Sequence, residues 1–264
     1  MELVQSKIIL LTAGLAPDNF VRAAKRISVD AKQLYNFSDV HILGESNLAT
    51  YCPTTVKLYE EFLNSEIRGY GYWIWKPEFI YRALAGEFGS VDQVVWVDSG
   101  CEVNSNFVSK KVFARRVKAT EGRGVWLHAL QSTDYEYSKH DVISQFPKIS
   151  ELQLRSPQIQ ANYMHFSRNQ GLPIVEEWFS RTTEKISNVN FETLNSENED
   201  FVEHRSDQSI LSLTAKSHGI TFDRLNLPNG GSRKAMIRGI FEPIWISRNR
   251  DGKTRIPRAI RWIP

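Results

Sequence analysis

One stretch of the chain, residues 91–102, constrains the fold more than any other. It reads Val91-Asp-Gln-Val-Val-Trp-Val-Asp98-Ser-Gly-Cys-Glu102. The apolar residues at 94–97 are continuous instead of alternating, which is typical of a central strand covered on both faces of an α/β sheet. Ligands collect outside the carboxyl ends of such strands, so Asp98 and Gly100 are expected to face a metal or a sugar. The structural alternative is that Asp98 caps the following turn through its side chain.

The remaining sequence alternates strand and helix patterns, which predicts a single α/β domain with a Rossmann-like, mixed, mostly parallel central sheet flanked by helices. Polar loops are expected over 131–141 and 188–203. Hydrophobic periodicity and the positions of capping residues, glycine and proline predict the bounds of the elements. Strands are expected at 7–12, 40–43, 91–97, 124–128, 158–167 and 220–222, and helices at 18–27, 77–84, 106–118, 173–186 and 206–218.

Length and composition exclude several classes of protein. With 264 residues, 41% hydrophobic and 24% charged, the chain matches a soluble domain with a large core, and it has no apolar run near 18 residues. The first residues lack the basic region and cleavage site of a signal peptide, so a cytoplasmic protein is expected. Two cysteines, Cys52 and Cys101, agree with a reducing compartment.

Basic charge is concentrated at the carboxyl terminus. Residues 233–264 hold nine Lys or Arg against Glu242 and Asp251, which gives +7 and leaves −4 for residues 1–232. We therefore treat 1–232 as the main domain and 233–264 as a basic extension. A basic segment interleaved with Ile, Pro and Trp suits an anionic membrane surface, a polyanionic acceptor or, as the least favoured of the three, a nucleic acid, and a solvated tail without a partner is the alternative.

The loop after the first strand is poor in glycine. A dinucleotide-binding unit has G-x-G-x-x-G there, whereas this chain has only Gly14. This difference argues against NAD, FAD or S-adenosylmethionine at that loop.

The decapeptide Arg68-Gly-Tyr-Gly-Tyr-Trp-Ile-Trp-Lys-Pro77 is the most unusual in the chain. Its aromatic rings suit a sugar or a base, and its glycines allow close backbone approach. Pro77 suits the first turn of a helix, which places Lys76 beside free backbone N–H groups that could hold a diphosphate. Alternatively, Trp73 and Trp75 pack in the core and Lys76 faces solvent.

A second polar segment, His204-Arg-Ser-Asp-Gln-Ser-Ile-Leu211, begins a helix. Ser206 is expected to cap this helix, and Asp207 lies in its first turn, where the helix dipole favours a negative charge. That structural role is the alternative to a role for Asp207 in chemistry.

Three motifs together resemble bacterial glycosyltransferases of the GT-A type, the nucleotide-diphospho-sugar transferases found with capsule and O-antigen genes. They are Gly69-Tyr-Gly-Tyr-Trp-Ile-Trp-Lys-Pro77, Trp96-Val-Asp-Ser-Gly-Cys101 and His204-Arg-Ser-Asp-Gln-Ser-Ile-Leu211, with weaker likeness at 137–141 and 158–161. The resemblance spans about residues 7–223. It implies a GT-A-like fold, a nucleotide-sugar donor with UDP favoured, a divalent cation (Mn²⁺ or Mg²⁺), and a glycan or lipid-linked acceptor. A peripheral position at the inner face of the cytoplasmic membrane is the matching expectation.

The resemblance also implies roles for individual residues. Asp207 and Asp98 are the expected catalytic carboxylates, with Asp207 as base or acceptor-positioning group. The expected donor-binding residues are Thr12, Tyr72, Trp75, Lys76, Asp98 and Gly100; the acceptor side would use Lys139, Asp141, His204 and Gln208; and the metal ligands would be Asp98, Glu102 and His204.

One position departs from the family pattern. Many GT-A enzymes have Asp-x-Asp after the central strand, whereas here Gly100 stands at the third position. A hard cation prefers oxygen ligands, so Asp98 needs help from Glu102, His204, Asp207 or water. Breaking a sugar–diphosphate bond requires neutralisation of the leaving group, and inversion also requires a base.

Two other functions are compatible with parts of the pattern. A Rossmann-like methyltransferase also has an acidic residue after a strand, but it would have a glycine-rich first loop. A non-catalytic carbohydrate-binding protein would explain the aromatic residues, but such modules are commonly all-β.

Overall fold

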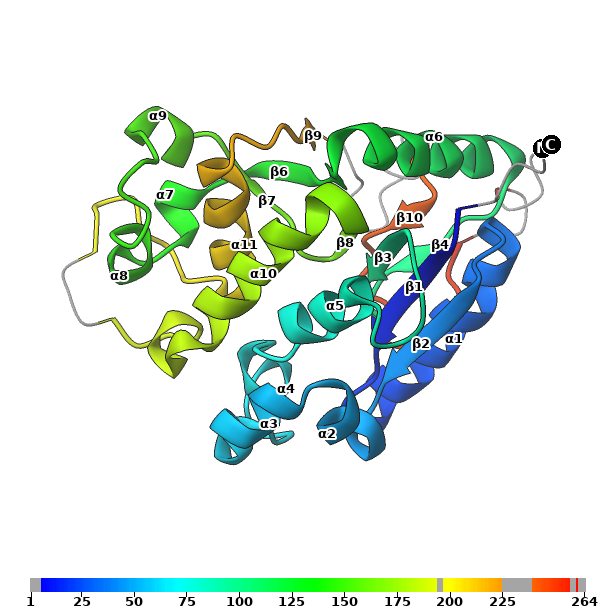
Figure 1. Ribbon diagram of the computed structural model, residues 1–264, viewed down its shortest axis with the longest axis horizontal. Helices are drawn as coiled ribbons and strands as arrows, with labels where there is room; N and C mark the ends of the chain where they lie inside the picture. The colour runs from blue at the N-terminus through cyan, green and yellow to red at the C-terminus, as the bar shows by residue number, and fades with distance from the viewer. Residues whose placement is uncertain (1–5, 194–196, 225–238, 257–259, 261–264) are drawn as a thin grey trace.

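A five-stranded sheet forms the centre of the protein (Figure 1). The computed structural model describes residues 6–193, 197–224, 239–256 and 260. In sheet order the strands are β2 (Asp39–Leu43), β1 (Ile8–Ala13), β3 (Gln93–Val97), β8 (Tyr163–Ser167) and β5 (Val125–Trp126). Only β8 runs antiparallel to its neighbours, so the other four strands share one direction. This confirms the predicted mixed, mostly parallel sheet.

The continuous apolar run is the middle strand of the sheet. Every residue of β3 is buried. Val94 and Trp96 belong to one hydrophobic cluster, whereas Val95 and Val97 belong to the cluster on the opposite face. Burial on both faces is the reason that the strand lacks alternation.

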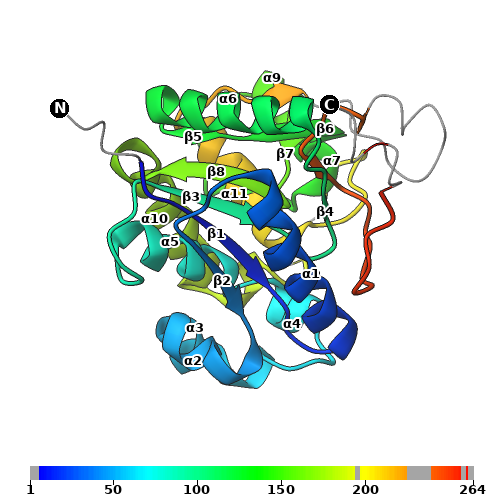
Figure 2. The same cartoon turned by 90° about the vertical axis from the view of Figure 1, so that its right-hand side faces the viewer.

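Helices cover both faces of the sheet (Figure 2). One face packs against α1 (Asp18–Leu34) and α6 (Phe107–Arg123), and the other against α5 (Lys76–Ala85) and α10 (Arg168–Glu184). Helix α6 begins where predicted, because the Asn106 side chain accepts a hydrogen bond from the Ser109 N–H. The predicted flanking helices are confirmed.

A second group of elements lies on the left of Figure 1, beyond α10. A three-stranded sheet has the order β7-β6-β9, and helix α11 packs against α10 and β7. The bounds of these elements are β6 (His128–Thr133), β7 (Pro157–Ile159), β9 (Asp223–Arg224), α7 (Asp134–Tyr137), α8 (His140–Ile143), α9 (Glu151–Leu154) and α11 (Ser206–Ser217).

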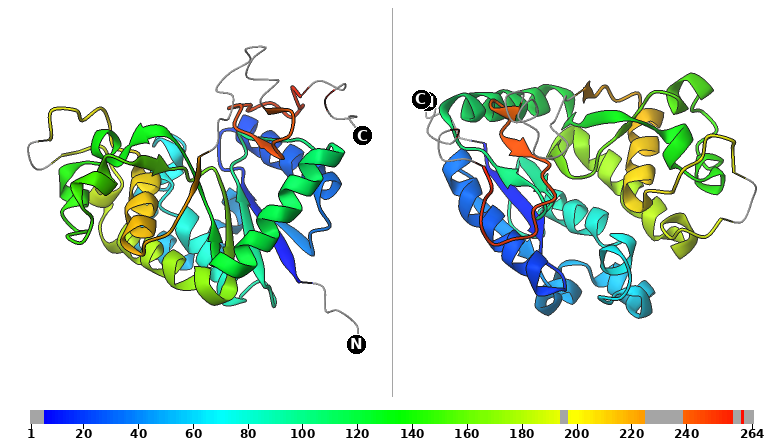
Figure 3. Two further views of the ribbon diagram at one scale, coloured as in Figure 1. Left: turned by 90° about the horizontal axis from the view of Figure 1, so that it is seen from above. Right: turned by 180° about the vertical axis from the view of Figure 1, so that it is seen from behind.

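Short elements complete the described chain. Between β2 and α5 lie η1 (Glu45–Asn47), α2 (Leu48–Tyr51), α3 (Pro53–Tyr59), η2 (Glu60–Phe62) and α4 (Gly69–Tyr72), and η3 (Ile186–Asn188) follows α10. In addition, β4 (Glu102–Val103) pairs antiparallel with β10 (Ile244–Trp245). This pairing holds the carboxyl-terminal segment, drawn in orange and red, beside α1 and the central sheet (Figure 3).

Two predicted strands are each divided in the structure. The segment 158–167 forms β7 and β8, which belong to different sheets, and 124–128 forms β5 and the first residue of β6. Nearly every residue on both sides of each break is buried, so the pattern alone does not reveal the change of sheet.

Other predicted bounds are also wrong. Helix α10 begins at Arg168 instead of Pro173, because the Ser167 side chain caps it by accepting a hydrogen bond from the Gln170 N–H. The predicted loop 131–141 contains the end of β6, helix α7 and the start of α8, and the strand expected at 220–222 is instead β9, at Asp223–Arg224. Ser206 does not cap α11, since its buried hydroxyl lacks a hydrogen-bond partner among the described residues.

The described part of the basic extension packs on the rest of the protein. Ile244 belongs to the hydrophobic cluster beneath α1 and α6, and Arg116 of α6 forms a 2.6 Å ion pair with Glu242. The predicted boundary between residues 232 and 233 lies outside the described residues. Within the described ranges, no helix is both long and apolar enough to cross a bilayer.

Candidate active site

Three of the motifs meet at one buried lysine. The Nζ of Lys76 lies 3.4 Å from Oδ1 of Asp98 and 3.0 Å from Oδ2 of Asp207. Helix α5, the end of β3 and the first turn of α11 each supply one of these residues. We call Lys76, Asp98 and Asp207 the charged triad.

Asp98 is the most exposed member of the triad. Its side chain is 35% exposed, whereas Lys76 and Asp207 are 3% and 4% exposed. The Trp96 indole N–H donates a 2.7 Å hydrogen bond to Asp98 Oδ1. The following turn is closed by the Cys101 N–H and the backbone carbonyl of Asp98, at 2.9 Å. The Asp98 carboxylate therefore contacts Trp96 and Lys76 instead of capping that turn, and it stays partly exposed.

Burial and charge together set the proton affinities of the triad. Burial raises the pKa of Asp207, the Lys76 ammonium opposes this effect, and the Asp98 charge adds to it, so that the pKa reaches about 6. Burial alone would lower the pKa of Lys76, but the charges of Asp207 and Asp98 outweigh burial and raise it. One lysine with two carboxylates thus leaves one excess negative charge that a proton or a cation can neutralise.

A left-handed turn precedes the lysine. Residues 69–73 all have positive φ, between 55° and 92°. Three of them are not glycine, and each such residue costs about 1–2 kcal/mol in this conformation. Gly69 is required, because a Cβ there would lie 2.3 Å from the Trp73 ring. Strain of this kind persists where the surrounding structure fixes it, and it is common beside functional sites.

The aromatic residues of the decapeptide mainly support this turn. Trp75 is buried in the core, and its indole N–H donates a 3.1 Å hydrogen bond to the Gly69 carbonyl. Trp75 therefore has the structural role proposed as the alternative. Tyr72 is half-buried and packs edge-on against Phe191. The alternative of a solvent-facing Lys76 is wrong, because the lysine is buried between two carboxylates.

Two further predicted residues adjoin the triad. The carbonyl of Ala161 accepts a 3.3 Å hydrogen bond from Lys76 Nζ, and the Ala161 N–H donates to Gln208 Oε1 at 3.4 Å. Gln208 also donates a 2.8 Å hydrogen bond to Gln158 Oε1. Gly100 lies in the turn that follows Asp98, where its carbonyl accepts a hydrogen bond from the Asn249 N–H.

The remaining predicted residues have other surroundings. Thr12 is buried in β1, and within the described part of the chain its hydroxyl has no hydrogen-bond partner. Lys139 is buried, and its ammonium donates to the carbonyls of Asn190 and Glu192. Asp141 lies in α8, where its carbonyl accepts a hydrogen bond from Gln145. None of these contacts connects them with the charged triad.

The predicted metal ligands do not come together. Glu102 accepts hydrogen bonds from the Thr254 hydroxyl and the Arg255 N–H. The Nε2 of His204 lies 2.8 Å from the Asn188 carbonyl, and its Nδ1 accepts from the Lys139 N–H at 3.4 Å. Burial is the main reason that the pKa of His204 falls to about 3.

The donor set at Asp98 is consequently poor for a protein-bound cation. Three or more His, Cys, Asp or Glu side chains are nowhere grouped as metal ligands within the described ranges. The Lys76 ammonium already lies beside Asp98. A set made of Asp98, Glu102 and His204 does not fit this geometry, and Asp98 is the one predicted ligand that remains partly exposed.

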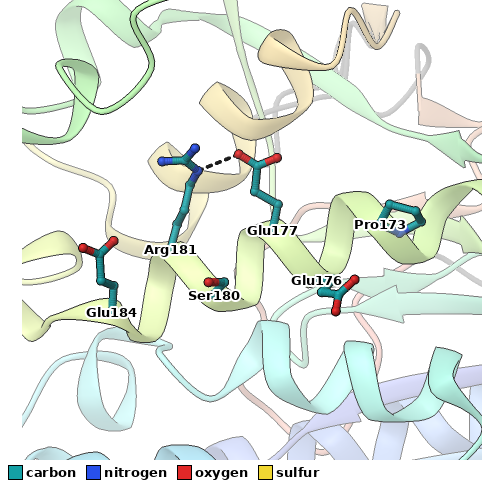
Figure 4. A pocket seen from close by; sticks show the side chains of 6 residues that line it. All are labelled: Pro173, Glu176, Glu177, Ser180, Arg181 and Glu184. Atoms are coloured by element: carbon teal, nitrogen blue, oxygen red, sulfur yellow. Dashed lines mark hydrogen bonds and ion pairs between the residues drawn. The ribbon is translucent and has the colours of Figure 1, made fainter.

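A hollow elsewhere on the surface is separate from the triad (Figure 4). Helix α10 alone lines it, and Glu177 within it is paired with Arg181 and with His218, each at 2.6 Å. The lining residues are Pro173, Glu176, Glu177, Ser180, Arg181 and Glu184. It contains no member of the charged triad, so we do not assign the chemistry to it.

Two arginines near the triad are not among the predicted site residues. Arg205 precedes α11, and its guanidinium lies 3.5 Å above the Tyr137 ring. Arg248 lies opposite Gly100, because a Cβ on that glycine would be 3.7 Å from the Arg248 Cα. The motif around Asp207 could have indicated Arg205. By contrast, nothing local in the sequence links Arg248 with Gly100.

Comparisons with known proteins give a likeness of fold only. Neither protein-family models nor curated protein sequences gave a match. Mouse xyloside xylosyltransferase 1, in its apo form, aligns at 10% identity and a TM-score of 0.46 over 91% of this chain and 97% of its own. A glycosyltransferase involved in glycosylation of the major capsid of PBCV-1 aligns at 12% identity and 0.47, over 90% and 91%. The glycosyltransferase GlyE of Streptococcus pneumoniae TIGR4 aligns at 13% identity and 0.39, over 84% and 46%.

Proposed function

We propose that this protein is a glycosyltransferase that moves a sugar from a nucleotide-diphosphate sugar, with UDP-sugars favoured, to a glycan acceptor. The observation that carries this proposal is the charged triad at the carboxyl end of β3. An open α/β sheet binds ligands at this end of its strands. The partly exposed Asp98, backed by the buried Lys76, is suited to polar contacts with a sugar or a diphosphate.

Each member of the triad has a proposed role. Asp98 contacts the substrate, and Lys76 fixes the positions of both carboxylates. Asp207 is the candidate base, because a carboxyl with a pKa of about 6 is ionised at neutral pH and still accepts a proton readily. In the transfer step the anomeric carbon–oxygen bond to the diphosphate breaks, the acceptor oxygen forms the new bond, and its proton passes to this base.

The first loop does not support the methyltransferase alternative. Gly14 is a packing residue, because a Cβ there would lie 2.9 Å from Ala24 of α1. The glycine therefore allows close contact between helix and loop. The α/β architecture also differs from the all-β fold common among carbohydrate-binding modules.

Calorimetric titration tests the proposed function most directly. We would titrate the protein with UDP, GDP, ADP and dTDP, and then measure release of nucleoside diphosphate from the matching sugar donors. Binding of one nucleotide, weakened in Asp98→Asn and retained in Glu177→Gln, is expected. The Glu177 variant is the matched control because Glu177 lies in the hollow on α10. Absence of binding by all four nucleotides would reject the proposal.

The acceptor is proposed to be lipid-linked, as in surface polysaccharide synthesis at the inner face of the membrane. The proposal is supported by exposed basic residues of the carboxyl-terminal segment, such as Arg250 and Lys253. Each basic residue near an anionic surface contributes about 1 kcal/mol. Flotation with phosphatidylserine vesicles should therefore show weaker binding for Arg250→Gln/Lys253→Gln. Equal binding to neutral and anionic vesicles would contradict membrane attachment.

A further inference from the structure

The carboxyl-terminal segment is attached directly to the turn that follows Asp98. The Asn249 N–H donates a 2.8 Å hydrogen bond to the Gly100 carbonyl, and the Ser247 hydroxyl donates to the same oxygen at 3.3 Å. Strand β10 pairs with β4 just beyond this turn. Residues 244–256, which we call the strap, therefore border the turn that follows Asp98.

One buried arginine fixes the strap and the turn to each other. The Nη2 of Arg26, on α1, donates to the carbonyls of Ser99, Cys101 and Asn249 at 2.9, 2.6 and 3.1 Å. Its Nη1 donates to the Asp251 carbonyl. A guanidinium that bonds four carbonyls holds the two backbones in one arrangement, because loss of any of these bonds would leave a buried polar group unsatisfied.

Arg248 stands at the point where the strap crosses Gly100. Its neighbours Ser247 and Asn249 both bond to the Gly100 carbonyl. Arg248 itself has a φ of +53° and an exposed side chain. A left-handed conformation is unfavourable for arginine, so the contacts on either side must impose it. The result is a backbone held at a fixed place beside the turn, which carries the exposed Arg248 side chain.

A second cation lies close to this position. Arg205 is half-buried, and its Nη1 donates to Gln158 Oε1 at 3.3 Å. Burial is the largest cause that lowers the pKa of Arg205, and the positive charge of Arg248 lowers it further. Glu203, an exposed residue, is 4.0 Å from the Arg205 guanidinium. Arg205 directly precedes α11, whose first turn holds Asp207, and Arg248 stands beside the turn that follows Asp98, so two arginines from distant parts of the chain flank the segments that carry the triad.

We propose that Arg248, together with Arg205, binds the diphosphate of the donor at the Gly100 turn. This inference rests on the proposed function and extends it to a subsite formed by the strap. A planar guanidinium binds phosphate oxygens through paired hydrogen bonds. Its fixed positive charge would also stabilise the negative charge that develops on the diphosphate as the sugar leaves. The strap is therefore a part of the active site.

Titration with inorganic pyrophosphate, UDP and uridine tests the subsite. Arg248→Asn removes the charge with a residue that tolerates positive φ, and Arg248→Lys retains the charge. Arg250→Asn is the matched control, because Arg250 lies two residues along the strap with its guanidinium 4.8 Å above the Phe20 ring. Melting temperatures would verify that each variant folds.

The expected result is a loss for Arg248→Asn that depends on phosphate. Its affinity for pyrophosphate and UDP should fall about 10-fold or more, as expected for one charge-assisted contact, while its affinity for uridine stays the same. Arg248→Lys should be intermediate, and Arg250→Asn should change less than about 2-fold. Equal losses in the Arg248 and Arg250 variants, or no loss in either, would overturn the subsite.

The same titrations separate this inference from the proposed function. Normal binding of UDP by both the parent protein and Arg248→Asn would reject the subsite and leave the proposed function intact. Pyrophosphate binding that requires Arg248, without binding of UDP, GDP, ADP or dTDP, would support the subsite and reject nucleotide-sugar transfer. If the parent protein bound neither pyrophosphate nor any of these nucleotides, both proposals would be rejected.

Discussion

The Nζ of Lys76 lies 3.0 Å from Oδ2 of Asp207, and both side chains are buried. Asp98 lies on the other side of the same ammonium, at 3.4 Å. Removal of any one of these three charged groups should perturb the site, because each removal changes the net charge of a region with little access to water.

Replacement of the lysine should therefore destabilise the protein. Lys76→Met leaves two carboxylates without their cation, and loss of one partner of a buried ion pair typically costs about 3–5 kcal/mol. Urea unfolding should show this loss as a lower midpoint. The double variant Lys76→Met/Asp207→Asn should be less destabilised than the sum of its single variants, because it removes one unpaired carboxylate. Strict additivity would show that the two residues do not interact.

Asp207 should change turnover more than folding. Its pKa of about 6 lies above the ordinary aspartate value of about 4. Transfer should therefore fall as pH decreases through about 6, where the base becomes protonated. Asp207→Asn should lower the rate roughly 10²- to 10⁴-fold and abolish this pH dependence. Parallel measurements of rate and donor affinity would test this.

Asp207→Asn should also change how the stability of the protein depends on pH. The folded protein binds the Asp207 proton more tightly than the unfolded chain does. The contribution of Asp207 to the free energy of unfolding therefore decreases as pH rises from about 4 to about 6. Asp207→Asn should remove that decrease. For the transfer rate, Asp134→Asn is a suitable control, because Asp134 forms a comparable buried pair with Lys216, at 2.6 Å, away from the triad. A transfer rate for Asp207→Asn within a few-fold of the parent would assign Asp207 a structural role.

Dependence on a divalent cation stays a prediction, and the structure narrows the way to test it. We expect Mn²⁺ or Mg²⁺ to increase affinity for a nucleoside diphosphate, and we expect Asp98→Asn to remove that increase. His204→Gln should retain it, because both ring nitrogens of His204 contact backbone groups. Calorimetry with and without chelator measures the difference. An unchanged affinity after chelation would reject cation dependence.

Gly71 should be intolerant of a side chain. Its φ is +92°, and a Cβ would lie 2.8 Å from the Phe62 carbonyl oxygen. Gly71→Ala is therefore expected to lower the free energy of unfolding by at least about 1–2 kcal/mol. Gly44→Ala is the control, since Gly44 has a φ of −134° and nothing within 4 Å of the added Cβ. Similar unfolding midpoints for both variants would contradict a constrained left-handed turn.

The class of fold was predictable because burial leaves a local pattern. The run Val94–Val97 indicated a strand covered on both faces, and the structure confirms it. The bounds of strands and helices were less predictable where one sequence pattern continues through two elements. The alternation over 158–167 continues through a change of sheet, and the Ser167 cap starts a helix ahead of Pro173.

The residues of the site were more predictable than their arrangement in space. Lys76, Asp98 and Asp207 each stand in an unusual motif, but no local rule predicts that one lysine joins both carboxylates. His204 illustrates the opposite error. Its residue type suits a metal, yet its ring bonds the backbone at Asn188 and Lys139. Such partners come from packing between distant segments, which a single sequence does not encode in any visible spacing.

The bonds of Arg26 also have a practical consequence for truncation. A chain that stops before residue 239 would lose the Asn249 and Asp251 carbonyls, and Glu102 would lose the Thr254 hydroxyl and the Arg255 N–H. One deletion would thereby leave a buried cation and a buried anion poorly satisfied next to the Asp98 turn. A shortened protein that fails to bind sugar nucleotides or vesicles would thus report damage at the centre of the molecule, even though only its last residues had been removed.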